Sequence, residues 1–326
     1  MLANHTRNQH FVARVEQKLN AANPQAADRN LRIYSFRLID RKGYQLELES
    51  RNGRSIDSSL SLFDLFSFDV YRDSDIRMNF ESLFQRYETN IGTYTTRLLA
   101  KVSSGTNDVK EEVIGLFAAK LLNFIRNPYS IRKMMNTFPK VGTYEPVGPV
   151  LLNSYRRILG GKKPQQRYLC SQLGISDGDY IEWLRALFVL LMPAKEAHPK
   201  VFEQIIKLLL ENRKTQVVAY VHEYDANTCL LSDRGFSQPV PDGPHMEFSF
   251  NLCSNAFIDF LFVDVGAMFQ NRFPPRVIES YHNRPEVAVN VVPMRNNLSM
   301  LRRYNRRVVE QCYEHVYCAT PDGFPL

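Results

Sequence analysis

Four arginines near the end of the chain form the clearest charged pattern in the sequence, Arg302-Arg303 and Arg306-Arg307. In a helix that turns 100° per residue, these side chains fall within about 140° of one another. The opposite side of that helix would carry the apolar Leu298, Leu301, Val308, Val309 and Cys312. A basic helix face can contact phosphate groups. It is equally compatible with a solvated face whose arginines are favoured near the C-terminus by the helix dipole.

Asn305 is the exception within this helix, because its side chain projects into the middle of the apolar stripe. An amide buried there without a hydrogen bond would cost about 1–3 kcal/mol. We therefore expect Asn305 to have a buried partner, either a polar side chain or a backbone group. It is then either a structural clamp or a residue of a functional site.

A second polar group lies near the start, where Asn8, Gln9 and His10 directly precede the apolar Phe11 and Val12. A histidine can act as a general acid or base near neutral pH, and a neighbouring amide can orient a phosphate or a carbonyl. A histidine with only a structural hydrogen bond is the alternative for His10.

Glu81 and Glu88 lie two turns apart in a predicted helix, on nearly the same side of it and beside its apolar stripe. The helical rise separates their backbones by about 10 Å, so the two carboxylates could not easily share one metal ion. Each is expected to pair with a basic or amide group, and a surface ion pair is the default role for both.

Familiar enzyme motifs are missing. The chain has no G-x-x-x-x-G-K-[ST], G-x-G-x-x-G, G-x-S-x-G or H-E-x-x-H sequence, so ATP hydrolysis, dinucleotide chemistry and zinc proteolysis are not expected. Cys312-x-x-His315-x-x-Cys318 offers three soft ligands rather than four, and we expect no metal there. The residues identify no cofactor.

The elements that must position these residues follow from hydrophobic periodicity. Residues 11–19 have helical spacing, and residues 32–38 and 44–48 alternate as strands of a hairpin, with Gly43 available for a positive φ in the turn. Residues 58–71 predict a buried, aromatic-rich connection. Further helices are predicted at residues 75–99, 108–125, 149–159, 177–192 and 199–212. Asn107 or Asp108 can cap the second of these, and Ser176 or Asp177 the fourth.

The pattern changes after Arg213. Strands are predicted at residues 216–222, 229–231, 246–252 and 256–265, with a turn at Asp242-Gly243-Pro244, followed by a helix at 297–312 and a strand at 314–319. The fold class is therefore α+β: a central helical lobe flanked by the N-terminal hairpin and C-terminal antiparallel β segments, with a final basic helix. The domain ranges are 1–72, 73–212 and 213–326, unless all three form one domain.

Composition limits the function further. The chain has 326 residues, 44% of them hydrophobic, and 41 Lys and Arg against 34 Asp and Glu, a net charge of +7. A basic surplus permits an acidic partner such as nucleic acid. The five cysteines have no paired spacing, which favours reduced thiols in the cytoplasm. The N-terminus lacks the apolar run of a secretory signal, and the longest apolar stretch, residues 186–192, is too short to cross a bilayer, so no membrane is expected.

The opening Gln9-His10-Phe11-Val12 resembles the Q-H-[FY]-V-P box of a broad, mostly bacterial family of uncharacterised proteins, although Ala13 replaces the usual proline. Further similarity lies in residues 80–88 and 248–252, and in the closing segment from Leu301-Arg302-Arg303-Tyr304-Asn305 through Val316-Tyr317. The resemblance implies no established activity. It implies that His10, Glu81, Glu88 and Asn305 recur together.

Two functions fit these residues. The first is a nuclease-like effector acting on RNA or DNA, in bacterial defence against viruses or as a toxin. His10 would be its general acid or base, and Glu81 or Glu88 would orient it or supply a second carboxylate. Asn8, Gln9 and Asn305 would position the phosphate, while the four arginines bind the backbone. The second is a non-catalytic module that binds nucleic acid or a protein partner through the basic helix.

Overall fold

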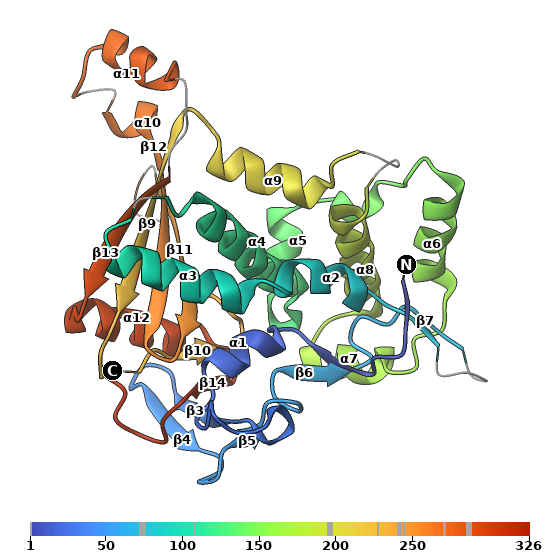
Figure 1. The fold of residues 1–326 in the computed structure, drawn as a ribbon. Coiled ribbons are helices and arrows are strands. Elements are labelled where there is room, and N and C mark those ends of the chain that lie inside the picture. Colours follow the sequence, from blue (N-terminus) through green and yellow to red (C-terminus); the bar gives the residue numbers. More distant parts are fainter. Residues whose placement is uncertain are drawn as a thin grey trace. The chain divides into compact units, whose positions relative to one another are not determined.

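The computed structural model describes residues 2–71, 76–106, 108–193, 198–226, 228–239, 243, 245–269, 272–284 and 289–326 (Figure 1). The chain divides into two compact units, each assembled from separate stretches. Unit 1 comprises residues 1–13, 57–89 and 121–204, and unit 2 comprises residues 14–56, 90–120 and 205–326. Helices and antiparallel sheets occur together, so the predicted α+β class is confirmed.

Unit 1 is mainly helical. Its helices are α2 (Glu81–Glu88), the end of α4 (Lys110–Arg126), α5 (Ile131–Thr137), α6 (Pro149–Gly160), α7 (Gln166–Leu173), α8 (Asp177–Leu191) and the start of α9 (Val201–Leu210). Its strands are β1 (Ala3–Asn4), β2 (Asn8–His10), β6 (Ser61–Phe63), β7 (Asp69–Val70) and β8 (Arg77–Met78). They form a three-stranded sheet in the order β1-β8-β7 and the two-stranded sheet β2-β6.

Helix α8 supplies the centre of unit 1. Ser176 and Asp179 close a reciprocal capping box, so the predicted Ser176 cap is confirmed. The indole of Trp183 and the phenol of Tyr180 are fully buried and donate to the carbonyls of Ile125 and Leu65, at 2.8 and 2.7 Å. The predicted connection over residues 58–71 is buried at Leu65, Phe66 and Phe68, but the prediction is wrong for Phe63 and Tyr71, which are 44% and 40% exposed.

Unit 2 contains two larger sheets. The first has the order β11-β12-β9-β13, built from β11 (His245–Cys253), β12 (Ala256–Asp264), β9 (Thr215–Glu223) and β13 (Val289–Arg295). The second has the order β10-β14-β3-β4, built from β10 (Leu231–Ser232), β14 (His315–Cys318), β3 (Arg32–Asp40) and β4 (Gln45–Leu48), with β5 (Arg54–Ser55) also paired to β3. Helices α1 (Arg14–Leu19), α3 (Ile91–Ser103), α10 (Val265–Phe269), α11 (Pro275–His282) and α12 (Leu298–Gln311) belong to this unit.

Helices cover both faces of the first sheet in unit 2 (Figure 1). On one face, Phe117 of α4 packs against Phe260 and Phe262 of β12, with ring centroids 4.9 and 5.5 Å apart. On the other face, Tyr304 of α12 stacks on Phe257 at 4.1 Å. Strand residues point alternately to opposite faces, so β12 supplies core contacts on both sides and reads as a nearly continuous apolar run.

The predicted N-terminal hairpin is confirmed, with β3 and β4 antiparallel. Its turn differs in one respect: the left-handed residue is Tyr44, with φ 55°, and not Gly43. The phenol of Tyr44 donates to the carboxylate of Glu310 at 2.7 Å, a tertiary contact that accompanies this backbone conformation.

The single helix predicted over residues 75–99 is wrong. The described part contains β8, then α2, then α3, with the break at Thr89-Asn90, and Asp75 lies outside the described residues. Threonine and asparagine are weak helix formers. The apolar positions that resembled one stripe serve two cores, because α2 belongs to unit 1 and α3 to unit 2.

The other long elements are found where periodicity predicts them, as α4, α6, α8, α9, α12, β9, β11, β12 and β14. Asn107, Asp242 and Pro244, expected as a cap and a turn, lie outside the described residues. The predictions omit the helices α5, α7, α10 and α11, the strand β13 and the two- and three-residue strands β1, β2, β5, β6, β7 and β8, which are short or carry mixed polarity. No helix in the described ranges is long and apolar enough to span a membrane.

Candidate functional site

Glu81 and Glu88 are the first and last residues of α2 in unit 1. At the start of α2, the backbone N–H of Glu81 donates to Oδ1 of Asn79 at 3.1 Å. Between the two glutamates, Phe84 is buried and packs edge-to-face on Phe66, with centroids 4.8 Å apart. This aromatic contact holds α2 against the unit and sets the positions of both carboxylates.

A buried arginine lies beside them. Arg126 ends α4 with its side chain 1% exposed, and its guanidinium forms an ion pair with the Glu88 carboxylate. The same guanidinium donates to Oδ1 of Asn123 at 3.0 Å and lies 4.9 Å from the centre of the Phe84 ring. We refer to these residues as the Glu81–Glu88–Arg126 cluster.

The two carboxylates of the cluster have different environments. The pKa of Glu81 is raised to about 7, mainly because the group is buried; the charge of Arg126 opposes the rise, and the negative charge of Glu88 adds to it. The buried Oε1 atom of Glu81 has no hydrogen-bond partner among the described residues. Glu88, by contrast, is paired directly with Arg126. The cluster therefore combines one carboxyl group that titrates near neutral pH with one held as part of an ion pair.

His10 lies half-buried on β2, where its backbone is opposite Ser61 of β6. Asn8, on the same short strand, is exposed and donates its amide to the carbonyl of Asp57. His10, Glu81 and Glu88 all belong to unit 1.

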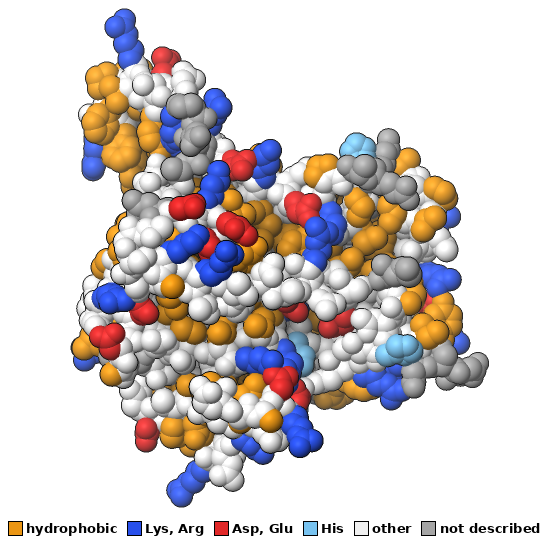
Figure 2. Space-filling view, viewed as in Figure 1, with side chains coloured by type: hydrophobic (Ala, Val, Ile, Leu, Met, Phe, Trp, Pro, Cys, Tyr) orange, Lys and Arg blue, Asp and Glu red, His pale blue; other side chains and the backbone are white. Residues whose placement is uncertain are grey.

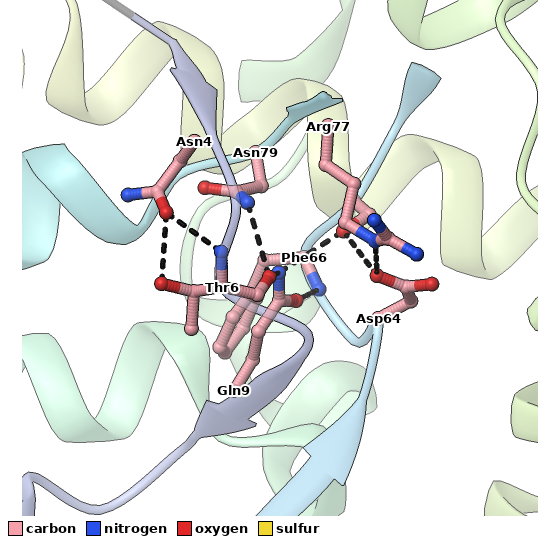
Figure 3. A network of polar contacts seen from close by, with 8 residues as sticks. Asn4, Thr6, Gln9, Asp64, Phe66, Arg77 and Asn79 are labelled. Carbon is pink, nitrogen blue, oxygen red and sulfur yellow. Dashed lines mark hydrogen bonds and ion pairs between the residues drawn. The ribbon is translucent and has the colours of Figure 1, made fainter. Parts of the chain in front are cut away.

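Gln9, which lies between Asn8 and His10 in β2, is fully buried and belongs to a polar network (Figure 3). Its Nε2 donates to the carbonyl of Thr6 at 3.1 Å and to the hydroxyl of Ser67 at 3.0 Å, and its Oε1 accepts the N–H of Phe66. The network continues through Asp64, whose carboxylate accepts from Ser67 and from Arg77 at 3.0 and 2.8 Å. The Gln9 amide thus fastens the N-terminal segment to the segment at residues 64–67.

Asn305 belongs to unit 2, where its amide also has backbone partners. Its Oδ1 accepts the N–H of Leu230 at 3.0 Å, and its Nδ2 donates to the carbonyls of Thr228 and Pro325 at 3.1 and 2.9 Å. The expected buried partner is therefore backbone. These bonds join α12 to the chain before β10 and to the C-terminal segment, as a structural clamp would.

The four arginines of α12 have different surroundings. Arg307 is largely buried and bonds to Glu247 at 2.8 Å and to Ser249 at 2.9 Å. Arg306 is exposed, donates to the carbonyl of Leu326 at 3.2 Å and lies 5.4 Å from the Tyr44 ring centre. Arg302 and Arg303 are exposed, and no side-chain partner of either is found in the described part of the chain. Of the apolar face, Leu298 is 43% exposed and the other four residues are buried.

Two sets of buried polar residues were missed by the sequence predictions. Lys120, Asn123 and Arg126 recur at every third position in an otherwise apolar part of α4, a spacing that could have marked them. In unit 2, Nε2 of His222 lies 3.3 Å from Oδ2 of Asp259, and the imidazole stacks on Phe257 at 4.2 Å. Asp259 interrupts an apolar strand, which was the available signal for this pair.

Within the described ranges, no group of three or more His, Cys, Asp or Glu side chains is arranged to hold a metal ion. No protein-family model, curated protein or solved structure matches this chain.

Proposed function

We propose that this protein is a nuclease-like hydrolase of RNA or DNA in which Glu81 transfers the proton. The observation that carries the proposal is the buried Glu81 carboxyl group in the Glu81–Glu88–Arg126 cluster, with its pKa raised to about 7 by burial. A general acid or base is most effective when its pKa lies near the working pH. Strongly perturbed groups of this kind occur preferentially at functional sites.

Glu88 and Arg126 act in this proposal as positioning residues. Arg126 is too buried to contact a substrate, but its charge lowers the proton affinity of Glu81, while that of Glu88 raises it. His10 remains the candidate for a second proton-transfer group in the same unit.

The substrate class is inferred from charge. The net charge of +7 favours a polyanion, as do the exposed Arg302 and Arg303, which have no side-chain partner among the described residues. A role in bacterial defence or as a toxin is part of this proposal. The unpaired cysteine spacing supports a cytoplasmic location.

The proposal is tested by incubating the purified chain with labelled single-stranded RNA, double-stranded RNA and DNA, with magnesium or with EDTA. Glu81→Gln should reduce cleavage about 100-fold or more, the usual contribution of general acid–base catalysis. Glu182→Gln is the matched control, because Glu182 is also half-buried in unit 1. If Glu81 acts as a general base, activity should rise with pH through about 7, because only the ionised carboxylate accepts a proton. Full cleavage by Glu81→Gln would refute the assignment of Glu81 as the proton-transfer residue. His10→Ala in the same assay tests His10 as the second proton-transfer group.

A binding module without catalysis is the second candidate, favoured by the exposure of Arg302 and Arg303. It predicts binding without turnover, measured by fluorescence anisotropy of labelled RNA over a salt series. The double variant Arg302→Ala/Arg303→Ala should weaken binding and reduce the salt slope by about 0.7 for each lost contact to a single strand. Arg156→Ala/Arg167→Ala removes the same charge from exposed positions of unit 1 and is the control. Salt-independent binding would contradict a phosphate interface.

A further inference from the structure

Helices α6 and α7 of unit 1 lie in a basic part of the sequence. Residues 146–176 contain five Lys or Arg residues and no Asp or Glu. Two of the five, Lys162 and Lys163, belong to the loop that follows Gly160, the last residue of α6. Figure 2 shows Lys and Arg side chains beside hydrophobic ones over the part of unit 1 that carries α6 and β7. A concentration of charge of one sign attracts a polyanion.

The loop after α6 is fixed against strand β7. The N–H of Val70 donates to the carbonyl of Lys162 at 2.9 Å, and the N–H of Lys162 donates to the Asp69 carboxylate at 3.1 Å. A Cβ atom at Gly161 would clash with the carbonyl oxygen of Phe68, so the loop approaches the strand this closely only with glycine at that position. The backbone therefore holds the two lysines beside β7.

Arg157 of α6 and Tyr71, the residue after β7, extend this basic area. The Arg157 guanidinium donates to the phenol oxygen of Tyr71, and its central carbon lies 6.0 Å from the centre of the Tyr71 ring. Both side chains reach the solvent, since Tyr71 is 40% exposed and the side chain of Arg157 is 39% exposed. We refer to Tyr71, Arg157, Lys162 and Lys163 as the Tyr71–Lys163 surface. It combines an aromatic ring with three cationic side chains.

The positive charge of the Tyr71–Lys163 surface exceeds the negative charge beside it. Oδ2 of the neighbouring Asp69 lies 3.7 Å from Nη1 of Arg157. The exposed Lys162 ammonium has no side-chain partner within the ranges that the structure describes. Lys163 is half-buried and donates to the carbonyl of Gly161 at 3.0 Å. Burial lowers the pKa of Lys163, and the charge of Asp69 opposes this. Three cations thus face one carboxylate, which leaves two positive charges for an anionic partner.

The strand beside this surface leads toward the Glu81–Glu88–Arg126 cluster. Strand β7 pairs with β8, with Asp69 opposite Met78, and α2 begins shortly after β8, at Glu81. The rings of Phe68 and Phe80, which precede β7 and α2 closest to these strands, lie 5.1 Å apart. The surface and the cluster therefore belong to the same packed part of unit 1.

We infer that the Tyr71–Lys163 surface binds single-stranded nucleic acid. Phosphate groups contact Arg157 and the two lysines, and an unpaired base stacks on the exposed Tyr71 ring. Stacking on an aromatic side chain accepts any base but requires a free base face, which a duplex does not offer. The inference rests on the proposed function, because it identifies the substrate of that hydrolase as a single strand.

Fluorescence anisotropy of a labelled RNA strand, alone and annealed to its complement, tests the inference. The full chain carries Glu81→Gln, so that the proposed cleavage does not consume the strand. The single strand should bind at least about tenfold more tightly than the duplex. Tyr71→Ala should weaken single-strand binding about tenfold at an unchanged salt slope, whereas Tyr71→Phe, which keeps the ring, should bind as before.

Lys162→Ala/Lys163→Ala tests the phosphate contacts. The double variant should weaken single-strand binding and reduce the salt slope by about 1.4, which is about 0.7 for each lost contact. Lys110→Ala/Lys207→Ala removes the same charge from exposed positions of unit 2 and should leave the slope unchanged.

Equal binding of strand and duplex, or unchanged binding by Tyr71→Ala, would overturn the inference. Loss of binding by Arg302→Ala/Arg303→Ala with Lys162→Ala/Lys163→Ala unaffected would also overturn it, because the nucleic acid would then lie on α12. The expected binding without any cleavage by the original chain would uphold the Tyr71–Lys163 surface and refute the hydrolase. Cleavage by the original chain, with single-strand binding unchanged by every one of these substitutions, would refute the surface alone.

Discussion

The Glu88 carboxylate forms an ion pair with the guanidinium of Arg126. Arg126 lies 126 − 88 = 38 residues later in the chain, and its side chain is almost completely buried. Both charges act on Glu81, but in opposite directions. The ion pair between α2 and the end of α4 therefore contributes two opposing charges that change the pKa of the neighbouring Glu81 carboxyl group.

Replacing Glu88 should lower the pKa of Glu81. Glu88→Gln removes the negative charge that favours the protonated form and leaves Arg126 to stabilise the ionised form. The pKa of Glu81 should then fall below its value of about 7. Carbon-13 NMR titration of the glutamate carboxyl groups measures this, with Glu182→Gln as control. A pKa that rises or stays constant would show that the charges do not couple as described.

The raised pKa of Glu81 should make stability depend on pH. Its carboxyl group keeps its proton to a higher pH in the folded chain than in the unfolded chain, whose ordinary pKa is 4.5. The free energy of unfolding should therefore decrease as pH rises from about 4.5 to about 7, by on the order of 2 kcal/mol.

Glu81→Gln should remove this decrease. Urea unfolding at intervals from pH 4.5 to pH 8 gives the comparison, since the variant and the original chain share every other titrating group. Curves that run parallel over the whole range would mean that the proton affinity of Glu81 is the same in both states.

Asn305→Ala should destabilise the chain by about 3 kcal/mol. The substitution removes three hydrogen bonds and leaves the backbone groups of Leu230, Thr228 and Pro325 without that partner. Thermal or urea unfolding measures the loss. Asn153→Ala, at an exposed position of α6, should change stability by less than about 0.5 kcal/mol. If Asn305→Ala instead abolished activity at unchanged stability, Asn305 would be a site residue.

The buried ion pair between Glu16 and Lys120 in unit 2 should be costly to break on one side only. Both side chains are fully buried, so Lys120→Met removes the partner charge of a carboxylate that has no access to water. We expect a loss of about 3–5 kcal/mol. The double variant Glu16→Leu/Lys120→Met should recover most of it, and a urea double-mutant cycle provides the coupling energy. Additive losses would indicate that the two charges are independent.

Local patterns in the sequence were sufficient for the fold class and most of the long elements. Alternation over residues 32–48 predicts the β3–β4 hairpin, and Ser176 marks the start of α8. These features depend on neighbours within a few residues, where periodicity and capping are visible. The same reasoning predicted α2 and α3 as one helix. A stripe of apolar residues does not show which of the two hydrophobic cores each helical turn packs against.

For the candidate site, residue types alone marked Glu81, Glu88 and Asn305 as polar groups beside or within apolar stripes. Residue types did not show that burial and Arg126 change the pKa of Glu81, whereas the amide of Asn305 is hydrogen-bonded to backbone groups. The difference depends on which distant segment packs against each side chain. A pKa or a hydrogen bond depends on distance in space, and only the tertiary fold brings α4 to α2 and Leu230 to α12.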